Sequence, residues 1–364
     1  MIKKILIGVG ILIIFALGIF VWSWYTIKPD ADKYLTFIKE HPEKAALYIV
    51  RNDTVIASQN ADTIMPLAST VKTLIAIEFA KQATAGIIKL ETEIDTAELD
   101  KYYLKGTDGN AHSNWLNQLH SDNLLNNGKV KLREVVKGMI RFSSNANTEY
   151  LMDLLGIENI NALRDSLGLT GHHAIYPFVS SLMICAKQNN DDIKQFTEKL
   201  DLMPIDEYIK KSFEVHQKLK KDSSFKKTFD AGSLLIDQQH IWSNRLPGGS
   251  VKQYVSIMQK INSRTYFDST TQIILDDIFE WPMKYKRNRE TFKHFGGKGG
   301  STSFVLTQAI YATDNQNNQT SIAIFFNNLF TMENIKLQAG SDEFILKILT
   351  DEIFRKKLQE TFKN

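Results

Sequence analysis

The sequence predicts an α/β (α+β) protein with an antiparallel sheet assembled from N- and C-terminal segments. Helices flank this sheet, and an all-helical subdomain is inserted between its two parts. Two observations predict this fold: β-rich runs lie at both ends of the chain, and helical periodicity fills the middle. With 364 residues, 43% of them hydrophobic, the chain can bury a substantial core.

The N-terminal run, residues 5–27, contains no charged side chain. A helix of this length reaches about 35 Å, enough to cross a hydrocarbon layer of ~30 Å. Trp22 and Trp24 lie where an aromatic belt meets lipid headgroups, and Lys3 and Lys4 favour a cytoplasmic N-terminus. We therefore expect a single-pass transmembrane anchor that places the rest of the chain in the periplasm or outside the cell.

A cleaved signal peptide is the alternative for this run. Its apolar part would normally span only about 7–15 residues and end at a site of the A-x-A type, which the sequence lacks. We predict the anchor over residues 1–28, a linker over 29–44 and one domain over 45–364, with the helical subdomain at about 88–290.

The elements of this domain follow from periodicity and turn residues. Residues 45–60 predict a hairpin around Asn52 and Asp53, and the apolar run after Pro66 predicts a buried helix ending near Gly86. The remaining predictions are helices over 131–140 and 146–156, a charged helical stretch with a solvated face over 187–230, two strands within 301–329, and a closing amphipathic helix over 341–358.

Composition argues against several classes of protein. The formal charge is only +3, and no basic block alternates with aromatic residues, so no nucleic-acid partner is expected. Cys185 is the only cysteine, which rules out an intramolecular disulfide and a lipid-modified N-terminal cysteine. The eight histidines lack the spacing of metal ligands, so we expect no metal and no cofactor.

Ser69 and Lys72, in "PLASTVKTL", are three residues apart and share one face of the predicted buried helix. Burial disfavours the ammonium form, so Lys72 can act as a base toward the Ser69 hydroxyl. The alternative is a lysine that reaches solvent from a partly exposed helix. Two further Ser-x-x-Lys copies lie within residues 223–227, where solvated lysines stay protonated and cannot accept a proton.

"PLASTVKTL" resembles the first motif of the serine β-lactamase and penicillin-binding-protein superfamily, especially its class A-like branch. For the second motif, Ser-x-Asn, residues 143–145 are preferred because they lie between two helical runs. The literal Ser-Asp-Asn at residues 121–123 lies in a polar stretch instead. Lys298-Gly299-Gly300 matches the third motif, before or at the start of a strand. The resemblance covers residues 45–360 and implies a β-lactamase-like fold.

The resemblance implies acyl-enzyme chemistry on an amide or ester in the bacterial cell envelope. Ser69 would be the nucleophile and Lys72 the base that takes its proton. Ser143 would relay a proton to the leaving nitrogen, and Asn145 would hold Lys72 and the substrate amide. Lys298 would attract a substrate carboxylate.

Substrate binding is expected at Gly300 and Ser301, next to the third-motif lysine. The backbone N–H groups of Ser69 and Ser301 would form the oxyanion hole. Gly299 stands where the family has threonine, so one hydroxyl is missing; Ser301, Thr302 or Ser303 are its candidate replacements.

The second departure concerns residues 163–183, where class A β-lactamases carry a glutamate that activates water. This stretch contains no glutamate; Asp165 is assigned to a helix, and His172 and His173 to an exposed loop. Acylation is therefore easier to support than deacylation. The leading interpretation is a membrane-anchored serine hydrolase acting on β-lactams, cell-wall D-alanyl peptides or another amide or ester. The alternatives are a penicillin-binding D,D-peptidase and a penicillin sensor that stays acylated.

Overall fold

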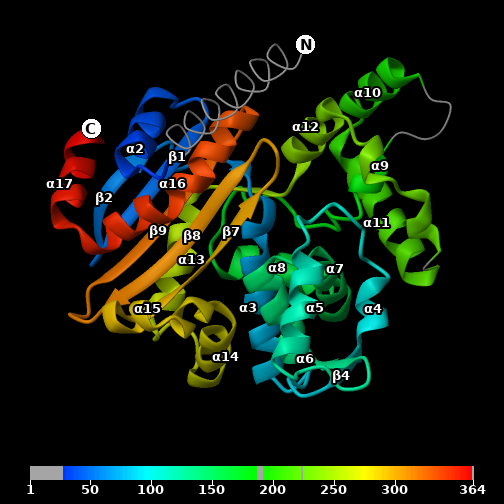
Figure 1. Ribbon diagram of the computed structural model, residues 1–364, viewed down its shortest axis with the longest axis horizontal. Coiled ribbons are helices and arrows are strands. Elements are labelled where there is room, and N and C mark those ends of the chain that lie inside the picture. Colours follow the sequence, from blue (N-terminus) through cyan, green and yellow to red (C-terminus); the bar gives the residue numbers. More distant parts are fainter. Residues whose placement is uncertain (1–27, 187–191, 223, 363–364) are drawn as a thin grey trace, which may run out of the picture.

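The computed structural model describes residues 28–186, 192–222 and 224–362 (Figure 1). The predicted transmembrane segment, residues 5–27, lies outside these residues. Among the helices that are described, none is both long enough and apolar enough to span a bilayer.

A five-stranded antiparallel sheet forms the centre of the fold, in the order β2-β1-β9-β8-β7 (Figure 1). It combines strands from both ends of the chain, as predicted. The strands are β1 (Ala45–Arg51), β2 (Thr54–Gln59), β7 (Phe292–Ser301), β8 (Leu306–Asp314) and β9 (Gln319–Phe326).

The predicted hairpin is confirmed by the pairing of β1 with β2. Its turn residues, Asn52 and Asp53, have φ values of 47° and 61°, a left-handed conformation that these short polar side chains tolerate. On its other side β1 pairs with β9, from Ala45 opposite Phe326 onward. This pairing joins segments that lie about 270–280 residues apart in the sequence.

One face of the sheet is covered by α2 (Ala31–Glu40), α16 (Thr331–Thr350) and α17 (Glu352–Thr361) (Figure 1). Tyr34 of α2 stacks on Phe344 of α16 with ring centroids 4.4 Å apart. The segment 29–44, which the sequence suggested as a linker, therefore contributes a helix to the core of this domain. Its apolar face, not its many charges, decides where it lies.

The opposite face packs against α13 (Val251–Ser263) and, beyond it, the helical half of the molecule. Tyr254 of α13 meets Phe325 of β9 edge to face at 5.5 Å. Although α13 falls within the range expected for the helical subdomain, it belongs with the sheet, because its apolar stripe is buried there.

The helical half is built around α3 (Lys72–Thr84), which is buried on nearly all sides. Its other helices are α4 (Thr96–Asp100), α5 (Ala111–Ser121), α6 (Leu132–Lys137), α7 (Asn145–Leu155), α8 (Ile157–Ser166), α9 (Leu182–Cys185), α10 (Ile193–Asp201), α11 (Ile205–Lys221) and α12 (Ile236–Arg245). Two short two-stranded sheets accompany these helices. One pairs β3 (Met65–Pro66) with β6 (Gly248–Gly249), and the other pairs β4 (Glu93–Asp95) with β5 (Lys129–Lys131). Between α13 and β7 come α14 (Ser269–Phe279), η5 (Trp281–Lys284) and α15 (Lys286–Thr291).

Candidate active site

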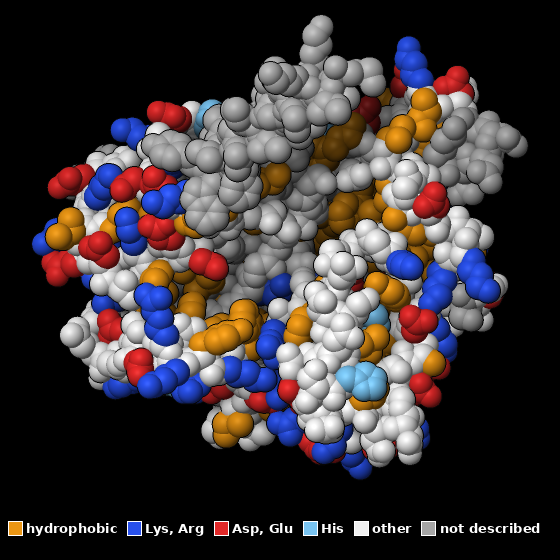
Figure 2. All heavy atoms as spheres, viewed as in Figure 1, with side chains coloured by type: hydrophobic (Ala, Val, Ile, Leu, Met, Phe, Trp, Pro, Cys, Tyr) orange, Lys and Arg blue, Asp and Glu red, His pale blue; other side chains and the backbone are white. Residues whose placement is uncertain are grey.

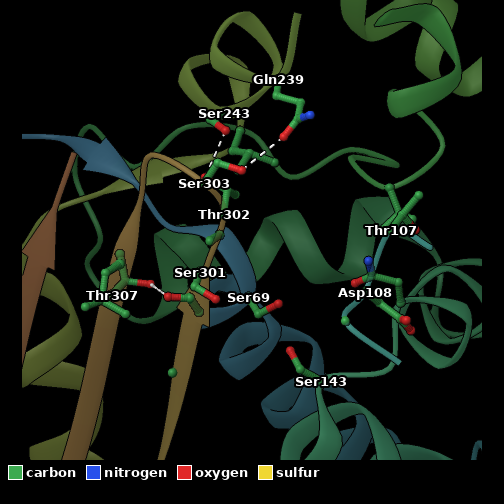
Figure 3. Close-up of a pocket in the computed structure, with 18 of the residues that line it drawn as sticks. Ser69, Thr107, Asp108, Ser143, Gln239, Ser243, Ser301, Thr302, Ser303 and Thr307 are labelled. Carbon is green, nitrogen blue, oxygen red and sulfur yellow. Dashed lines mark hydrogen bonds between the residues drawn. The ribbon is translucent and has the colours of Figure 1, made fainter. Parts of the chain in front are cut away.

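Ser69 lies in η1 (Ala68–Val71), a 3₁₀ turn that leads directly into α3. In the first turn of a helix the backbone N–H groups have no intrahelical acceptor, so the Ser69 N–H is available to a ligand. The preceding residue, Ala68, has φ 45°, a strained conformation for alanine that fixes the direction of the turn. The Ser69 hydroxyl points into a cleft between the sheet and the helical half (Figure 3).

Lys72 is fully buried one turn after Ser69. Its Nζ donates to the backbone oxygen of Ser143 at 2.7 Å and to Oδ1 of Asn145 at 2.9 Å. Burial lowers the pKa of Lys72 well below its ordinary value, and the charge of Lys298 lowers it further; the carboxylates of Asp108 and Glu149 act in the opposite direction. The site therefore favours the neutral amine form of Lys72.

Ser143 lies between the two lysines of the site. Its hydroxyl oxygen is 3.3 Å from Lys72 Nζ and 3.1 Å from Lys298 Nζ. Ser143 has φ 69° and terminates the π-helical turn η2 (Gly138–Phe142) before α7 begins. The left-handed residue turns the chain so that Ser143 and Asn145 both face Lys72.

Lys298 lies within the edge strand β7, and not before or at the start of a strand as the sequence suggested. It is 6% exposed, and burial lowers its pKa to about 7. Its Nζ also donates to the backbone oxygen of Gly299 at 2.5 Å. The chain thus holds two buried amines around one serine hydroxyl.

Gly300 brings β7 against η1. A methyl group at this position would overlap the Ser69 backbone nitrogen and lie 2.8 Å from that of Thr70. Only glycine allows this approach. It places the next residue of the strand, Ser301, beside Ser69 (Figure 3).

The backbone N–H of Ser301 points away from the sheet. Thr302 donates its N–H to Val305 across the β7–β8 turn at 2.9 Å. Since bonded residues alternate along an antiparallel ladder, the Ser301 N–H faces outward at the sheet edge. The backbone N–H groups of Ser69 and Ser301 can therefore both donate to the carbonyl oxygen of a substrate in the cleft.

The cleft around Ser69 has a volume of about 590 Å³. Hydroxyl groups of β7 and the following turn lie on one side, and Thr107 and Asp108 on the other (Figure 3). Thr302 accepts a hydrogen bond from Ser243, and Ser303 donates to Gln239. Among the described residues Ser301 Oγ has no such partner, so of the three candidate hydroxyls it is the one left for a substrate.

A family match covers the chain from α2 to the end of α13, which includes Ser69, Lys72, Ser143 and Asn145 but not Lys298. A family model described as the beta-lactamase enzyme family matches residues 30–263. The chain belongs to this family. A search of curated protein sequences finds no match.

Solved structures show the same fold at low sequence identity. A beta-lactamase from Sphaerobacter thermophilus is 16% identical, with TM-score 0.54, covering 91% of this chain and 98% of its own. A beta-lactamase from Chitinophaga pinensis is 14% identical, with TM-score 0.51 and coverages of 87% and 98%. A mutant of PBP-A, solved as an acyl-enzyme complex with penicillin G, is 15% identical, with TM-score 0.50 and coverages of 87% and 95%.

The cleft wall contributed by residues 177–182 presents Phe178, Val179 and Leu182, and no carboxylate. Asp165 lies in α8, as predicted. The prediction that His172 lies in an exposed loop is wrong: it is 5% exposed and 3.3 Å from the Tyr254 hydroxyl. Burial lowers its pKa to about 4, and neither it nor His173 lines the cleft.

Two residues that the sequence did not single out hold this wall in place. Glu149 of α7, fully buried, accepts from the backbone N–H groups of Val179 and Ser180 at 2.9 and 3.2 Å. His216 of α11 donates to Glu149 at 2.6 Å. Because both Glu149 oxygens are engaged, this carboxylate is not free to activate water.

A sequence signal existed for Glu149, but not for its partner. Glu149 follows Asn145 by four residues, the spacing of one helix face. His216 lies in the stretch 187–230, whose charges we expected to be solvated. Nothing in the sequence around it indicates burial against α7. The literal Ser-Asp-Asn at residues 121–123 is exposed at the end of α5 and does not line the cleft.

The Glu149–His216 pair makes stability depend on pH. Burial alone would lower the pKa of His216, but Asp153 and Glu149 more than offset it and raise the pKa to about 9. The charged His216 contributes fully to the free energy of unfolding below pH 6.5, the ordinary pKa of histidine, and this contribution is lost as the pH rises through 9. The difference is on the order of 3 kcal/mol. We expect His216→Gln to lower the denaturation midpoint strongly at pH 6 and much less at pH 10. An equal loss at both pH values would contradict a charged His216.

Proposed function

We propose that this chain is a serine hydrolase that forms an acyl-enzyme on the Ser69 hydroxyl, with a β-lactam or a cell-wall D-alanyl peptide as the substrate class. The observation that carries the proposal is the arrangement of Ser143 between the buried amines of Lys72 and Lys298. A structural role alone does not account for two lysines buried together, because each loses its hydration and repels the other.

In the acylation step Ser69 Oγ attacks the carbonyl carbon and its proton passes to the neutral Lys72 amine. Within the described residues Ser69 has no side-chain hydrogen bond to Lys72, so the proton transfer requires these two groups to move into contact. The oxygen of the tetrahedral intermediate takes its negative charge between the N–H groups of Ser69 and Ser301. One such donor contributes about 3–4 kcal/mol in well-studied hydrolases.

Collapse of the intermediate breaks the C–N bond and requires a proton on the leaving nitrogen. Ser143 donates its hydroxyl proton and recovers one from the Lys72 ammonium, whose Nζ lies 3.3 Å away. Lys298, next to the same hydroxyl, supplies positive potential for a substrate carboxylate. The step ends with an ester between Ser69 and the acyl group, and with Lys72 neutral again.

Hydrolysis of that ester requires a base that activates water. The wall segment 177–182, which lies in the stretch where class A β-lactamases carry their water-activating glutamate, presents apolar side chains, and Glu149 behind it is occupied. The carboxylate of Asp108 lies on the opposite side of the cleft (Figure 3). We therefore expect rapid acylation and slow deacylation. This behaviour suits a penicillin-binding D,D-peptidase or a penicillin sensor better than an efficient β-lactamase.

We further propose that residues 5–27 anchor this domain in the membrane, with the cleft in the periplasm or outside the cell. The uncharged apolar run after two lysines supports this proposal. Substrates derived from the cell wall are found on that side of the membrane.

Intact-mass measurement of the full chain tests the proposed chemistry. With a fluorescent penicillin we expect one covalent adduct that persists for many minutes and is absent in Ser69→Ala. A chromogenic cephalosporin should show a burst and little turnover. Fast turnover would identify a β-lactamase instead, and an adduct retained by Ser69→Ala would disprove Ser69 as the nucleophile.

Gly299 offers a gain-of-function test of carboxylate recognition. A Cβ atom there would lie 3.5 Å from the Thr307 oxygen and 3.8 Å from Gln308 Cγ, which is ordinary contact. Thr therefore fits and restores the missing hydroxyl. We expect Gly299→Thr to raise the second-order acylation rate about tenfold for penicillins, because a hydrogen bond to a charged group contributes ~1.5–3 kcal/mol. The matched Gly299→Val, which fills similar volume without a hydroxyl, should give no increase.

A further inference from the structure

Five large hydrophobic side chains are exposed together at the starts of α12 and α16. They are Leu235, Ile236, Phe330, Met332 and Ile335, and each is between 41% and 71% exposed. We call these five residues the apolar edge. A single exposed hydrophobic residue is ordinary on a protein surface, whereas a group of them indicates an interaction site.

Hydrogen bonds hold the starts of these two helices next to each other. Ser303, in the turn between β7 and β8, donates to Gln239 of α12 and accepts at its backbone oxygen from Asn334 of α16, both at 3.0 Å. His240 lies 3.0 Å from the side chain of Asn328, just before α16. Both helix starts lie along the upper edge of the molecule (Figure 1), and hydrophobic side chains are visible over α12 (Figure 2). Since Gln239 also lines the cleft, the apolar edge borders the cleft.

The charged residues among these side chains balance one another. Glu333 pairs with Lys44 at 2.8 Å, and exposed Asp237 and Lys336 add one charge of each sign. Lys44 also lies over the Phe330 ring, 4.2 Å from its centroid, but leaves that side chain 71% exposed. A surface with no excess of negative charge is not repelled by anionic lipid headgroups.

The anchor proposed above ends close to the apolar edge. The apolar run ends at residue 27, three residues before Asp30, so these two points are at most about 10 Å apart. The Asp30 backbone lies against α16, because a methyl group at Gly340 would be 3.8 Å from its nitrogen and oxygen. Gly340 follows Phe330 by ten residues, or about 15 Å along a helix. The apolar edge therefore begins within about 25 Å of the end of the run.

We propose that the apolar edge lies on the membrane surface, with its side chains at the boundary between lipid headgroups and acyl chains. The proposal rests on the anchor at residues 5–27, and it adds which face of the domain meets the bilayer. The short connection is the reason for choosing lipid as the partner, since it keeps this face beside the membrane. Apolar faces held in this position are buried about 5–10 Å into the boundary.

Fluorescence quenching of the full chain in phosphatidylcholine vesicles tests the proposal. A bimane label is attached at Ile236→Cys or at Phe330→Cys, two exposed positions whose replacement leaves the core intact. The native Cys185 is buried and should not react. With lipids that carry a nitroxide near the headgroup end of the acyl chain, we expect about a twofold loss of emission at both positions, together with a blue shift.

Ile87→Cys and Ile273→Cys are the matched controls. These isoleucines are 71% and 67% exposed, but they lie just after the end of α3 and in α14, away from the upper edge (Figure 1). Their labels should keep their emission in the presence of the nitroxide lipid. Leu17→Cys, inside the proposed anchor, should be quenched and reports separately on whether the run has inserted.

The four labels distinguish failure of this proposal from failure of the anchor. Quenching at residue 17 without quenching at 236 and 330 would overturn the membrane contact and leave the anchor in place. No quenching at residue 17 would disprove the anchor, on which the contact rests. A blue shift at 236 and 330 without quenching would mean that residues 5–27 or a second copy of the chain covers the apolar edge. Equal quenching at 87 and 273 would mean non-specific adsorption and would also overturn the proposal.

Discussion

Lys72→Ala should lower the rate of Ser69 acylation by about 10²–10⁴-fold, the usual contribution of a positioned general base. Among the described lysines, only Lys72 and Lys298 bond to the Ser143 hydroxyl, and Lys72 is the one that follows Ser69 by one helical turn. The rate is measured as the appearance of the penicillin adduct by intact mass under single-turnover conditions. A rate unchanged by Lys72→Ala would disprove the assignment of the base.

Lys81→Ala is the matched control, since Lys81 lies on the same helix with its side chain exposed. It should acylate at the normal rate. Lys72→Met preserves most of the buried volume, so a loss shared by the Ala and Met variants reflects chemistry and not a collapsed core.

The pH dependence provides a further check on Lys72. Burial and the charge of Lys298 lower its pKa, and the neutral amine is the reactive form. The acylation rate should therefore rise with pH and level off well below pH 10.5, the ordinary pKa of lysine. A rate that keeps rising toward pH 10.5 would mean that Lys72 is protonated in the resting site.

Gly300→Ala should lower acylation by at least about 10²-fold, comparable to the loss of one oxyanion-hole donor. The added methyl group collides with the backbone of Ser69 and Thr70, which cannot rotate away as a side chain would. The strand must therefore move away from η1, and the amides of Ser69 and Ser301 separate. Overpacking of this kind also costs about 1–3 kcal/mol of stability.

Gly299→Ala is the appropriate comparison, because it places the same methyl group one residue earlier, where the nearest atom is 3.5 Å away. It should keep acylation within a few-fold of the unmodified chain. Thermal denaturation of both variants shows whether each has folded. Equal activity in the two variants would mean that the approach of β7 to η1 is not needed for catalysis.

Local sequence patterns were sufficient to predict much of the fold. The hairpin turn at Asn52 and Asp53 needs residues that tolerate positive φ, and those residues are visible in the sequence. The helix at residues 145–155 ends at Gly156 for a similar reason. The segment 29–44 was harder, because the contacts that bury α2 come from α16, some 300 residues later.

The candidate site likewise has one part that local sequence predicts and another that depends on contacts between distant residues. Ser69 and Lys72 are separated by one turn, so their common face follows from helix geometry alone. Ser143, in contrast, is 71 residues from Lys72 and 155 from Lys298. Sequence order indicated that these residues belong to one site, but it contained no information on which atoms touch.

The sequence by itself determined that a buried lysine follows Ser69, that the chain alternates strands and helices in this order, and that residues 163–183 offer no glutamate to activate water. Only the tertiary structure decided that Ser143 bridges two amines, that Gly300 must be glycine, and that His216 secures the cleft wall through Glu149. The physical reason is the range of the interactions. Propensity and periodicity act over a few residues, whereas a site is assembled by contacts whose partners are brought together only when the core closes.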